Sequence, residues 1–319
     1  MKCIFFGTPE FASAILETLI QENINICAVI TRPDTPQGRS LKLASPSVKL
    51  TTLEHLKEVP VLQPTKCSSP EFIETLRSFQ ADLFIVVAYG EILSQLLLEI
   101  PPKGCINVHA SLLPAFRGAA PMQRSLMQGC TETGVTIMRM VRKMDAGAIL
   151  DVEKMQVPED MMIEELEQAL RKLGAKALLR VIKRLENSPL SGVPQDESKV
   201  TFAQKITPQD CSISWRNSAR DIHNQTRALS PFPGAVCEVV IRGEKKRLKI
   251  IKTHVFSDEH EGETQAPPGT FYQDSRFALF VVCGTGILQV DEVQLEGKKR
   301  MPAAEFLKGI KVSEIFPVV

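Results

Sequence analysis

The stretch Asp82-Leu83-Phe84-Ile85-Val86-Val87-Ala88-Tyr89 decides the fold class of this chain. It is apolar on both faces, which is typical of a strand in a parallel sheet that is covered on both sides. Similar strand-like segments alternate with helix-like segments through the first half of the chain, and they span residues 2–7, 24–30, 105–109 and 134–140. Because such alternation implies right-handed crossovers, the sequence predicts an α/β fold with a doubly wound parallel sheet.

The helices of this half are predicted from a cap and from apolar spacing. Thr8 is a candidate N-cap, and Pro9 suits the first helical position because a missing N–H costs nothing there. Apolar residues then recur at helical spacing, at Phe11, Ile15, Leu16, Leu19 and Ile20. Residues 162–185 have the same periodicity and predict another helix.

The chain changes character after residue 186. Residues 187–199 are polar and contain prolines and a glycine, which is typical of a linker. Short β-like segments separated by turn residues follow, at 235–241, 248–254, 278–283 and 286–293. They predict a small antiparallel β-barrel, so we expect domains at 1–189 and 207–319 joined by a linker at 190–206.

The composition agrees with a folded protein of two domains. The chain has 319 residues, 44% of them hydrophobic and 24% charged, and its net charge is +1. These values exclude a disordered, collagen-like or coiled-coil chain and a wholly basic surface, so any nucleic-acid contact must come from local patches. No apolar run approaches the roughly 18–20 residues that cross a bilayer, so we expect no membrane association.

Eight scattered cysteines indicate the expected compartment. None of them belongs to a Cys-x-x-Cys pair, so neither a zinc site nor a redox pair is expected. Free thiols of this kind suit a reducing environment, and we therefore expect a cytoplasmic protein that uses no metal.

The first turn from strand to helix argues against a dinucleotide-binding enzyme. It reads Phe6-Gly7-Thr8-Pro9-Glu10-Phe11, with one glycine where a pyrophosphate-binding turn has the pattern Gly-x-Gly-x-x-Gly. Glu10 also places a carboxylate where a phosphate would lie. A nicotinamide-dependent dehydrogenase is therefore not expected.

The densest group of candidate functional residues lies at 107–118. Asn107 and His109 are two residues apart on a predicted strand, so their side chains share one face at its C-terminal end. An amide donor beside an imidazole can stabilise a developing oxyanion. The proline-containing loop that follows is expected to leave backbone N–H groups free for a ligand. The alternative is a histidine at a strand end that bonds only to its neighbours.

Asp145 is a candidate partner for this histidine. It follows the next predicted strand, whose end would bring its carboxylate beside His109 and favour the imidazolium. The alternative is an aspartate that serves only the turn before Gly147.

Two basic regions are candidate contacts for phosphates. The loop at 31–42 is long for its position and carries Arg32, Arg39 and Lys42. In the second domain, residues 242–249 include a run of cations, Lys245, Lys246 and Arg247, and residues 298–300 form another. Basic edges of a small barrel suit an RNA backbone, whereas solvated loops and turns are the alternative.

Taken together, these segments resemble the methionyl-tRNA formyltransferase family. The resemblance spans nearly the whole chain and rests on residues 6–11, 31–39, 87–90, 107–118, 144–147, 213–215 and 231–235. The group of Asn107, His109 and Asp145 alone would also fit other enzymes that use formyltetrahydrofolate, such as glycinamide ribonucleotide formyltransferase. The basic loop and the second domain favour the enzyme that acts on tRNA.

The resemblance implies a Rossmann-like formyltransferase domain followed by an OB-like barrel, and it implies roles for named residues. Asn107, His109 and Asp145 match the catalytic positions of the family. The segment that matches the folate contact consists of Ser111, Leu112, Leu113 and Pro114. Arg39 and its loop match the insertion that contacts the acceptor stem of the tRNA.

Three residues depart from the family pattern without removing a catalytic position. They are Ala110, Ser40 and Ala148, each at a position where the family often has another residue. The departures at Ser40 and Ala148 bear on loop flexibility and local charge.

The implied reaction moves the formyl group of 10-formyltetrahydrofolate to the α-amino group of methionyl initiator tRNA, for the initiation of translation. We expect a monomer that contacts this tRNA through both basic regions. A formyltransferase for nucleotide sugars is the nearest alternative, because it would share the catalytic set. A non-catalytic RNA-binding protein is the other, although it would not need Asn107, His109 and Asp145.

Overall fold

The computed structural model describes residues 1–37, 42–188, 191–258 and 266–317, which form two compact units. The first, here called the sheet unit, comprises Met1–Ala119, Glu132–Gln156 and Glu167–Ala203. The second, here called the barrel unit, comprises Ala120–Thr131, Val157–Leu166 and Gln204–Val319. Each unit thus combines separate segments of the chain, and the domain boundaries given above remain a prediction. Within the described ranges, no helix has the length and apolar character needed to cross a membrane.

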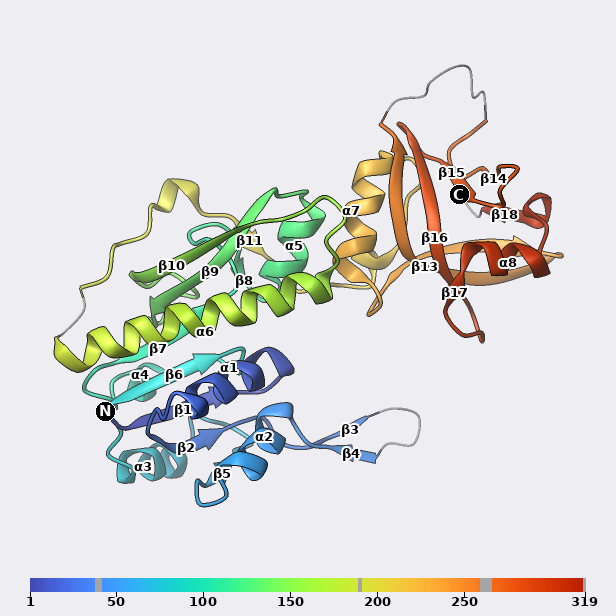
Figure 1. Ribbon diagram of the computed structural model, residues 1–319. Coiled ribbons are helices and arrows are strands. Elements are labelled where there is room, and N and C mark those ends of the chain that lie inside the picture. The colour runs from blue at the N-terminus through green and yellow to red at the C-terminus, as the bar shows by residue number, and fades with distance from the viewer. Residues whose placement is uncertain (38–41, 189–190, 259–265, 318–319) are drawn as a thin grey trace. The chain divides into compact units, whose positions relative to one another are not determined.

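A seven-stranded sheet forms the centre of the sheet unit, in the order β10-β9-β7-β6-β1-β2-β5 (Figure 1). Its strands are β1 (Cys3–Gly7), β2 (Ile26–Ile30), β5 (Val61–Leu62), β6 (Leu83–Val87), β7 (Cys105–His109), β9 (Glu132–Arg139) and β10 (Ile149–Gln156). Strands β1, β2, β5, β6 and β7 pair in parallel, whereas β9 and β10 are antiparallel additions at one edge. Every residue of β6 is buried, as its apolar sequence predicts, and the α/β class is confirmed.

Helices cover both faces of this sheet. On one face, α6 (Ile163–Asn187) approaches α1 (Glu10–Gln21) and β7 so closely that a Cβ on Gly174 would lie 3.1 Å from Val108. On the other face, α3 (Pro70–Ser78) and α4 (Gln95–Leu98) contribute Leu76 and Leu97 to a core with Phe6. A further helix, α2 (Ser47–His55), packs against α1.

The predicted cap of α1 is wrong. Pro9 occupies the N-cap position and makes no side-chain bond there. The Thr8 hydroxyl instead donates to the Tyr89 carbonyl at 2.8 Å, because the turn after β1 lies beside the end of β6. Thr8 therefore ties two neighbouring strand ends together.

Two short strand pairs complete the sheet unit. The hairpin of β3 (Thr35–Gln37) and β4 (Lys42–Ala44) extends away from the main sheet (Figure 1). The other pair joins β8 (Arg117–Gly118) in parallel to β11 (Phe202–Ala203), which follows the short helix η1 (Glu197–Lys199). Residues that the sequence assigns to a linker thus pair with the strand after β7.

The barrel unit contains a second seven-stranded sheet, antiparallel and nearly closed (Figure 1), which confirms the predicted barrel. Its strands are β12 (Ala235–Ile241), β13 (Glu244–Ser257), β14 (Phe271–Gln273), β15 (Leu279–Val282), β16 (Ile287–Leu295), β17 (Met301–Pro302) and β18 (Ile315–Pro317). In its core the rings of Trp215 and Phe271 pack edge to face, with centroids 5.6 Å apart.

Helices α5 (Pro121–Met127), α7 (Ala219–Leu229) and α8 (Ala303–Gly309) belong to the barrel unit, as do the short helices η2 (Gln209–Cys211) and η3 (Val312–Glu314). The sequence does not predict α7. The buried residues of this helix include His223, Asn224, Thr226 and Arg227, so a stripe of apolar residues is hardly visible in its sequence. Ser218 caps it by accepting a bond from the backbone N–H of Asp221.

Candidate active site

Asn107 and His109 lie on one face of β7, at its C-terminal end. The Asn107 side chain is partly exposed, and within the described residues it has no hydrogen-bond partner. His109 is buried, with an exposed fraction of 5%. Its Nε2 atom lies 2.9 Å from the Phe116 carbonyl oxygen, and its Nδ1 atom lies 3.8 Å from Oδ2 of Asp145. The predicted group of amide, imidazole and carboxylate is therefore brought together.

The carboxylate of Asp145 is held by a backbone N–H group of β8. Its Oδ2 atom accepts a hydrogen bond of 2.8 Å from the backbone N–H of Gly118. The side chain of Asp145 is 16% exposed, and its backbone has a φ of 49°, in the left-handed region. A non-glycine residue in this conformation requires support from its surroundings.

Asp145 approaches His109 from a loop, and not from the end of a neighbouring strand as the sequence predicts. Strand β9 runs antiparallel to β7 and places Thr136, rather than its own C-terminal end, beside His109. The end of β9 lies next to the start of β7. Asp145 reaches His109 because the loop at 140–148, between β9 and β10, folds back toward it.

The segment from Ser111 to Pro114 forms an irregular loop, but its backbone is less free than expected. The N–H of Leu113 donates to Oγ1 of Thr136 at 3.1 Å, and the Thr136 hydroxyl donates to the Ser111 carbonyl at 2.7 Å. The hydroxyl of Ser111 donates to the Ala115 carbonyl. The expectation of free backbone donors is wrong at Leu113, because a buried threonine from β9 satisfies that N–H.

The sequence does not predict a hydrogen-bond network centred on a buried arginine, which contacts the Asp145 loop. Arg117 is 1% exposed, and its Nε and Nη2 atoms donate to Oε1 of Gln195 at 3.0 and 2.8 Å. Nη2 also donates to Glu197, which accepts a further bond from Lys143. These bonds hold the pKa of Glu197 at about 2, with Arg117 as the larger cause. Arg117 lies in the segment at 107–118 that the sequence marks as functional. The sequence around Gln195 is polar and contains no motif.

The first basic region is described only in part. Arg32 donates to Glu91 at 3.0 Å, so its charge is already paired within the sheet unit. Arg39 and Ser40 lie outside the described residues. For Lys42 only the backbone is described, at the start of β4.

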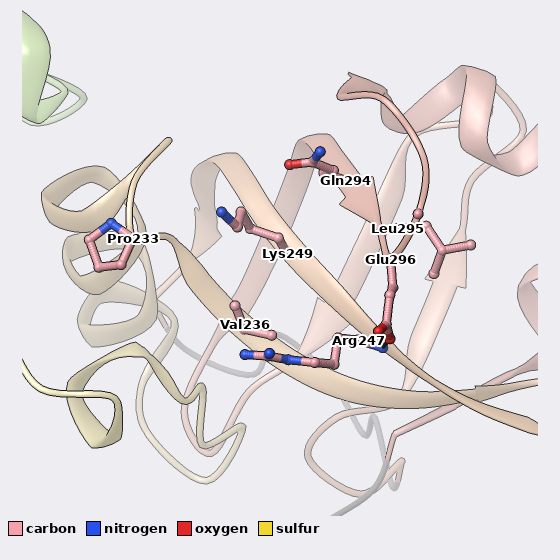
Figure 2. A pocket seen from close by; sticks show the side chains of 8 residues that line it. Pro233, Val236, Arg247, Lys249, Gln294, Leu295 and Glu296 are labelled. Carbon is pink, nitrogen blue, oxygen red and sulfur yellow. Dashed lines mark hydrogen bonds between the residues drawn. The ribbon is translucent and has the colours of Figure 1, made fainter. Parts of the chain in front are cut away.

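The second basic region divides into paired cations and cations beside a cavity. Lys245 is paired with Glu238 at 2.6 Å, and Lys246 with Glu244 at 2.8 Å. A cavity of about 290 Å³ on the same sheet is lined by Arg247 and Lys249, together with Pro233, Val236, Gln294, Leu295, Glu296 and Gly297 (Figure 2). The guanidinium of Arg247 has no ion-pair partner among the residues that the structure covers.

The buried thiols of the sheet unit are not candidate nucleophiles. Burial raises the pKa of Cys3, Cys67 and Cys105 to about 12. Thiols with such pKa values are almost wholly protonated at neutral pH, and the thiolate is the reactive form. In the part of the chain that the structure describes, no group of three or more His, Cys, Asp or Glu residues could hold a metal ion.

Comparison with known proteins relates this chain to formyl transferases. The formyl transferase family model matches residues 1–182, and the model of the formyl transferase C-terminal domain matches residues 205–311. The chain is 45% identical to a methionyl-tRNA formyltransferase of Protochlamydia amoebophila, over 99% of this chain and 97% of the relative. It is 40% identical to methionyl-tRNA formyltransferases of Chlamydia pneumoniae (99% and 97% covered) and Acetivibrio thermocellus (98% of each).

Solved structures share the fold. The N-formyltransferase from Helicobacter canadensis, in complex with folinic acid and dTDP-3-aminofucose, matches with a TM-score of 0.66 at 18% identity, over 91% of this chain and 98% of that one. HypX from Aquifex aeolicus, in complex with tetrahydrofolic acid, matches with a TM-score of 0.65 at 15% identity, over 97% of this chain and 48% of that one. At these identities the likeness concerns the fold alone.

Proposed function

The chain belongs to the methionyl-tRNA formyltransferase family, and from this membership we propose that it transfers the formyl group of 10-formyltetrahydrofolate to the α-amino group of methionyl initiator tRNA. The observation that supports this most directly is the group of Asn107, His109 and Asp145 around the end of β7. Such a group suits acyl transfer to an amine, in which negative charge develops on a carbonyl oxygen.

When bound, the folate supplies a formyl carbon that the neutral amine attacks. A new C–N bond forms, and the bond between the formyl carbon and folate N10 breaks. The amine loses a proton, and N10 gains one. Asn107 donates an amide N–H to the formyl oxygen as it becomes negative. The partly exposed amide, unbonded among the described residues, is available for this role. One donor of this kind typically contributes about 10²–10³ in rate.

His109 supplies the second donor. Both ring nitrogens face acceptors, Phe116 O and the Asp145 carboxylate, and an imidazole donates at both nitrogens only when it is protonated. We propose that His109 acts in this doubly protonated form during the reaction. The Nε2 hydrogen must then be shared between the Phe116 carbonyl and the formyl oxygen, or leave the carbonyl during the reaction.

Asp145 holds the imidazolium and receives a proton. Its carboxylate lies 3.8 Å from Nδ1 of His109, which is longer than a hydrogen bond. Such contacts are often long without substrate and tighten in the complex. We assign to Asp145 the movement of a proton from the attacking amine, directly or through water.

We assign the folate contact to the segment from Ser111 to Pro114, through side chains in preference to N–H groups. Ser111 and Leu113 are buried and held by Thr136, which gives the loop a defined shape. Leu112 and Pro114 are the partly exposed members of the segment. Their apolar surfaces suit an aromatic ring system.

We assign the contact with tRNA in the barrel unit to Arg247 and Lys249. Lys245 and Lys246 are neutralised by glutamates, so they offer little net charge to a phosphate. In Figure 2 the side chains of Arg247 and Lys249 extend along one face of the sheet. In the sheet unit, Arg39 and Lys42 remain predicted contacts, while Arg32 must first exchange Glu91 for a phosphate.

We further infer a cytoplasmic monomer. All eight cysteines are unpaired, which suits a reducing compartment, and initiation of translation takes place in the cytoplasm. Light scattering during gel filtration should give a mass near 35.4 kDa. A mass near twice that value would contradict the monomer.

A formylation assay tests the proposed reaction. The protein is incubated with 10-formyltetrahydrofolate and, in separate reactions, with methionyl initiator tRNA or an amino sugar linked to a nucleoside diphosphate. We expect formylmethionyl-tRNA and no formylated sugar. Formylation of the sugar alone would establish the alternative function, and no product with an active donor would refute both.

A further inference from the structure

We propose that Gln195 is a positioning residue, which holds the loop of Asp145 so that its carboxylate faces His109. Gln195 lies in the stretch that the sequence assigns to a linker. The proposed reaction does not itself require this residue. It touches none of the reacting groups directly. The expected effects on the rate rest on the proposed function, whereas the expected effects on the Asp145 loop rest on the structure alone.

The side-chain amide of Gln195 is bonded at both ends. Its Nε2 atom donates to the backbone carbonyls of Asp145 at 2.7 Å and Gly147 at 2.8 Å. Its Oε1 atom accepts both bonds from Arg117. Because the guanidinium can only donate and the carbonyls can only accept, the amide has one possible orientation. One side chain thus fixes the backbone on both sides of Ala146.

The Asp145 loop needs such support. Asp145 has a positive φ, which costs of order 1 kcal/mol or more for a residue with a side chain. Gly147 is packed so closely that a Cβ there would lie 1.7 Å from the Arg139 carbonyl oxygen. The carbonyls that flank this strained turn are the ones that Gln195 holds, so its bonds act where the backbone would otherwise relax.

The same stretch of chain also holds the other side of the site. Thr201 accepts the N–H of Phe116 on its hydroxyl at 2.9 Å, and its carbonyl accepts the N–H of Arg117 at 2.9 Å. Phe116 is the residue whose carbonyl faces His109. Residues 195–201 therefore fix the positions of both His109's carbonyl partner and the Asp145 loop, which sets the spacing between imidazole and carboxylate.

Further contacts fix that stretch in turn. Val193 pairs with Ile149 at the start of β10 through two backbone bonds of 2.8 Å. Beyond Thr201, β11 pairs with β8. Buried Arg117 links Gln195 to Glu197, and Glu197 links it to Lys143 in the same loop. Gln195 thus acts from a fixed segment.

Two substitutions separate positioning from simple packing. Gln195→Ala removes all four bonds, whereas Gln195→Glu keeps an acceptor for Arg117 and loses the donor to the two carbonyls. If the carbonyl bonds matter, both variants should lose kcat on the order of 10–100-fold, as for other groups that orient a functional side chain. The KM values for folate and tRNA should stay within about threefold, because neither substrate contact is removed. Full activity of Gln195→Glu would overturn the proposal.

A double-mutant cycle identifies the residue through which Gln195 acts. In an Asp145→Ala background, Gln195→Ala should change the residual kcat less than twofold, because the carboxylate that it positions is already absent. Equal losses in both backgrounds would show that Gln195 acts elsewhere. Gln204→Ala serves as the matched control, since this exposed glutamine makes no side-chain bond among the described residues.

Hydrogen–deuterium exchange tests the geometric part without any substrate. Amides at 143–147 should exchange faster in Gln195→Ala and Gln195→Glu than in wild type or Gln204→Ala. Unchanged exchange there would refute the positioning role. If the wild-type protein failed to formylate methionyl-tRNA, the proposed function would fail while this measurement still decided the role of Gln195.

Discussion

The surroundings of His109 illustrate how single residues shape this site. A buried imidazole lies between a backbone carbonyl oxygen 2.9 Å from Nε2 and a carboxylate oxygen 3.8 Å from Nδ1. Asn107, on the same face of β7, lacks such partners among the described residues and is free to turn toward a substrate. The two side chains thus differ in character, because His109 is held by neighbouring groups and Asn107 is adaptable.

Alanine substitutions at Asn107, His109 and Asp145 should separate chemistry from binding. We expect each to lower kcat by about 10²–10³, because each removes a group to which we assign a part in stabilising the transition state. The dissociation constant for tRNA should change less than about twofold. Rapid-quench assays with saturating tRNA, together with filter binding, measure the two quantities. His55→Ala, at an exposed histidine, is the control; near-wild-type turnover of any active-site variant would refute the role given to that residue.

Charge pairing distinguishes the cations of β13. Substituting Arg247 and Lys249 together by Gln should weaken tRNA binding and lower the slope of log K against log salt by about 1–2, since each lost phosphate contact removes a released counterion. Substituting Lys245 and Lys246 by Gln removes the same charge, but those lysines already pair with Glu238 and Glu244. Titrations at several salt concentrations compare the two. Equal changes in slope would mean that the cavity has no special part in binding.

At the scale of elements, β9 holds the loop after β7 through one buried hydroxyl. Thr136 lies directly beside His109 in the sheet, is fully buried, and bonds to both Ser111 and Leu113. A strand that runs antiparallel to its neighbour β7 therefore shapes the segment to which we assign the folate.

Replacing Thr136 by Val should loosen that segment without changing the volume of the core. The Ser111 carbonyl and the Leu113 N–H would lose their buried partner, which costs about 1–3 kcal/mol per group. We expect a lower free energy of unfolding and a higher KM for the folate, with a smaller effect on tRNA binding. Urea denaturation and initial-rate kinetics check this. Thr136→Ser, which keeps the hydroxyl, should retain most of the folate affinity; if it does not, the hydrogen bonds are not the cause.

The same elements show what the sequence can predict. Strands β6, β7 and β12 can be predicted from the sequence because their residues are apolar on the faces that they bury. Asn107, His109 and Asp145 can be predicted as candidate site residues because they lie in recognisable motifs. The direction of β9 cannot be predicted, since periodicity indicates a strand but gives no information about the strand that it pairs with. Gln195 acts through the backbone carbonyls of a distant loop, so nothing in its neighbouring sequence marks it.

At the scale of the molecule, a bidentate ion pair within the barrel unit connects α5 to η2, two elements that are far apart in the sequence. Arg124 of α5 donates to both carboxylate oxygens of Asp210 in η2, at 2.6 and 2.8 Å. Both side chains are 19% exposed. These bonds lower the pKa of Asp210 from 3.8 to about 2, chiefly through Arg124.

The stability that the wild type has in excess of Asp210→Asn should therefore depend on pH. Because the folded pKa lies below the unfolded one, the ionised pair stabilises the protein above about pH 4, and this contribution is lost as the pH falls toward about 2. We expect the variant to be about 2 kcal/mol less stable at pH 7, and the difference to shrink between pH 4 and 2. Guanidinium unfolding across this range measures it, with the exposed Glu58→Gln as control. A difference independent of pH would contradict the ionic explanation.

The interleaving of the two units has a consequence for synthesis on the ribosome. Ala120–Thr131 and Val157–Leu166 belong to the barrel unit, and they carry Leu126 and Leu166, both fully buried in the finished protein. The strands of the barrel unit are translated later, from residue 235 onward. At roughly 5–20 residues per second, α7, against which α5 packs, leaves the ribosome about 5–20 s after α5. The nascent chain thus passes through an interval in which α5 has been made and the helix that it packs against has not.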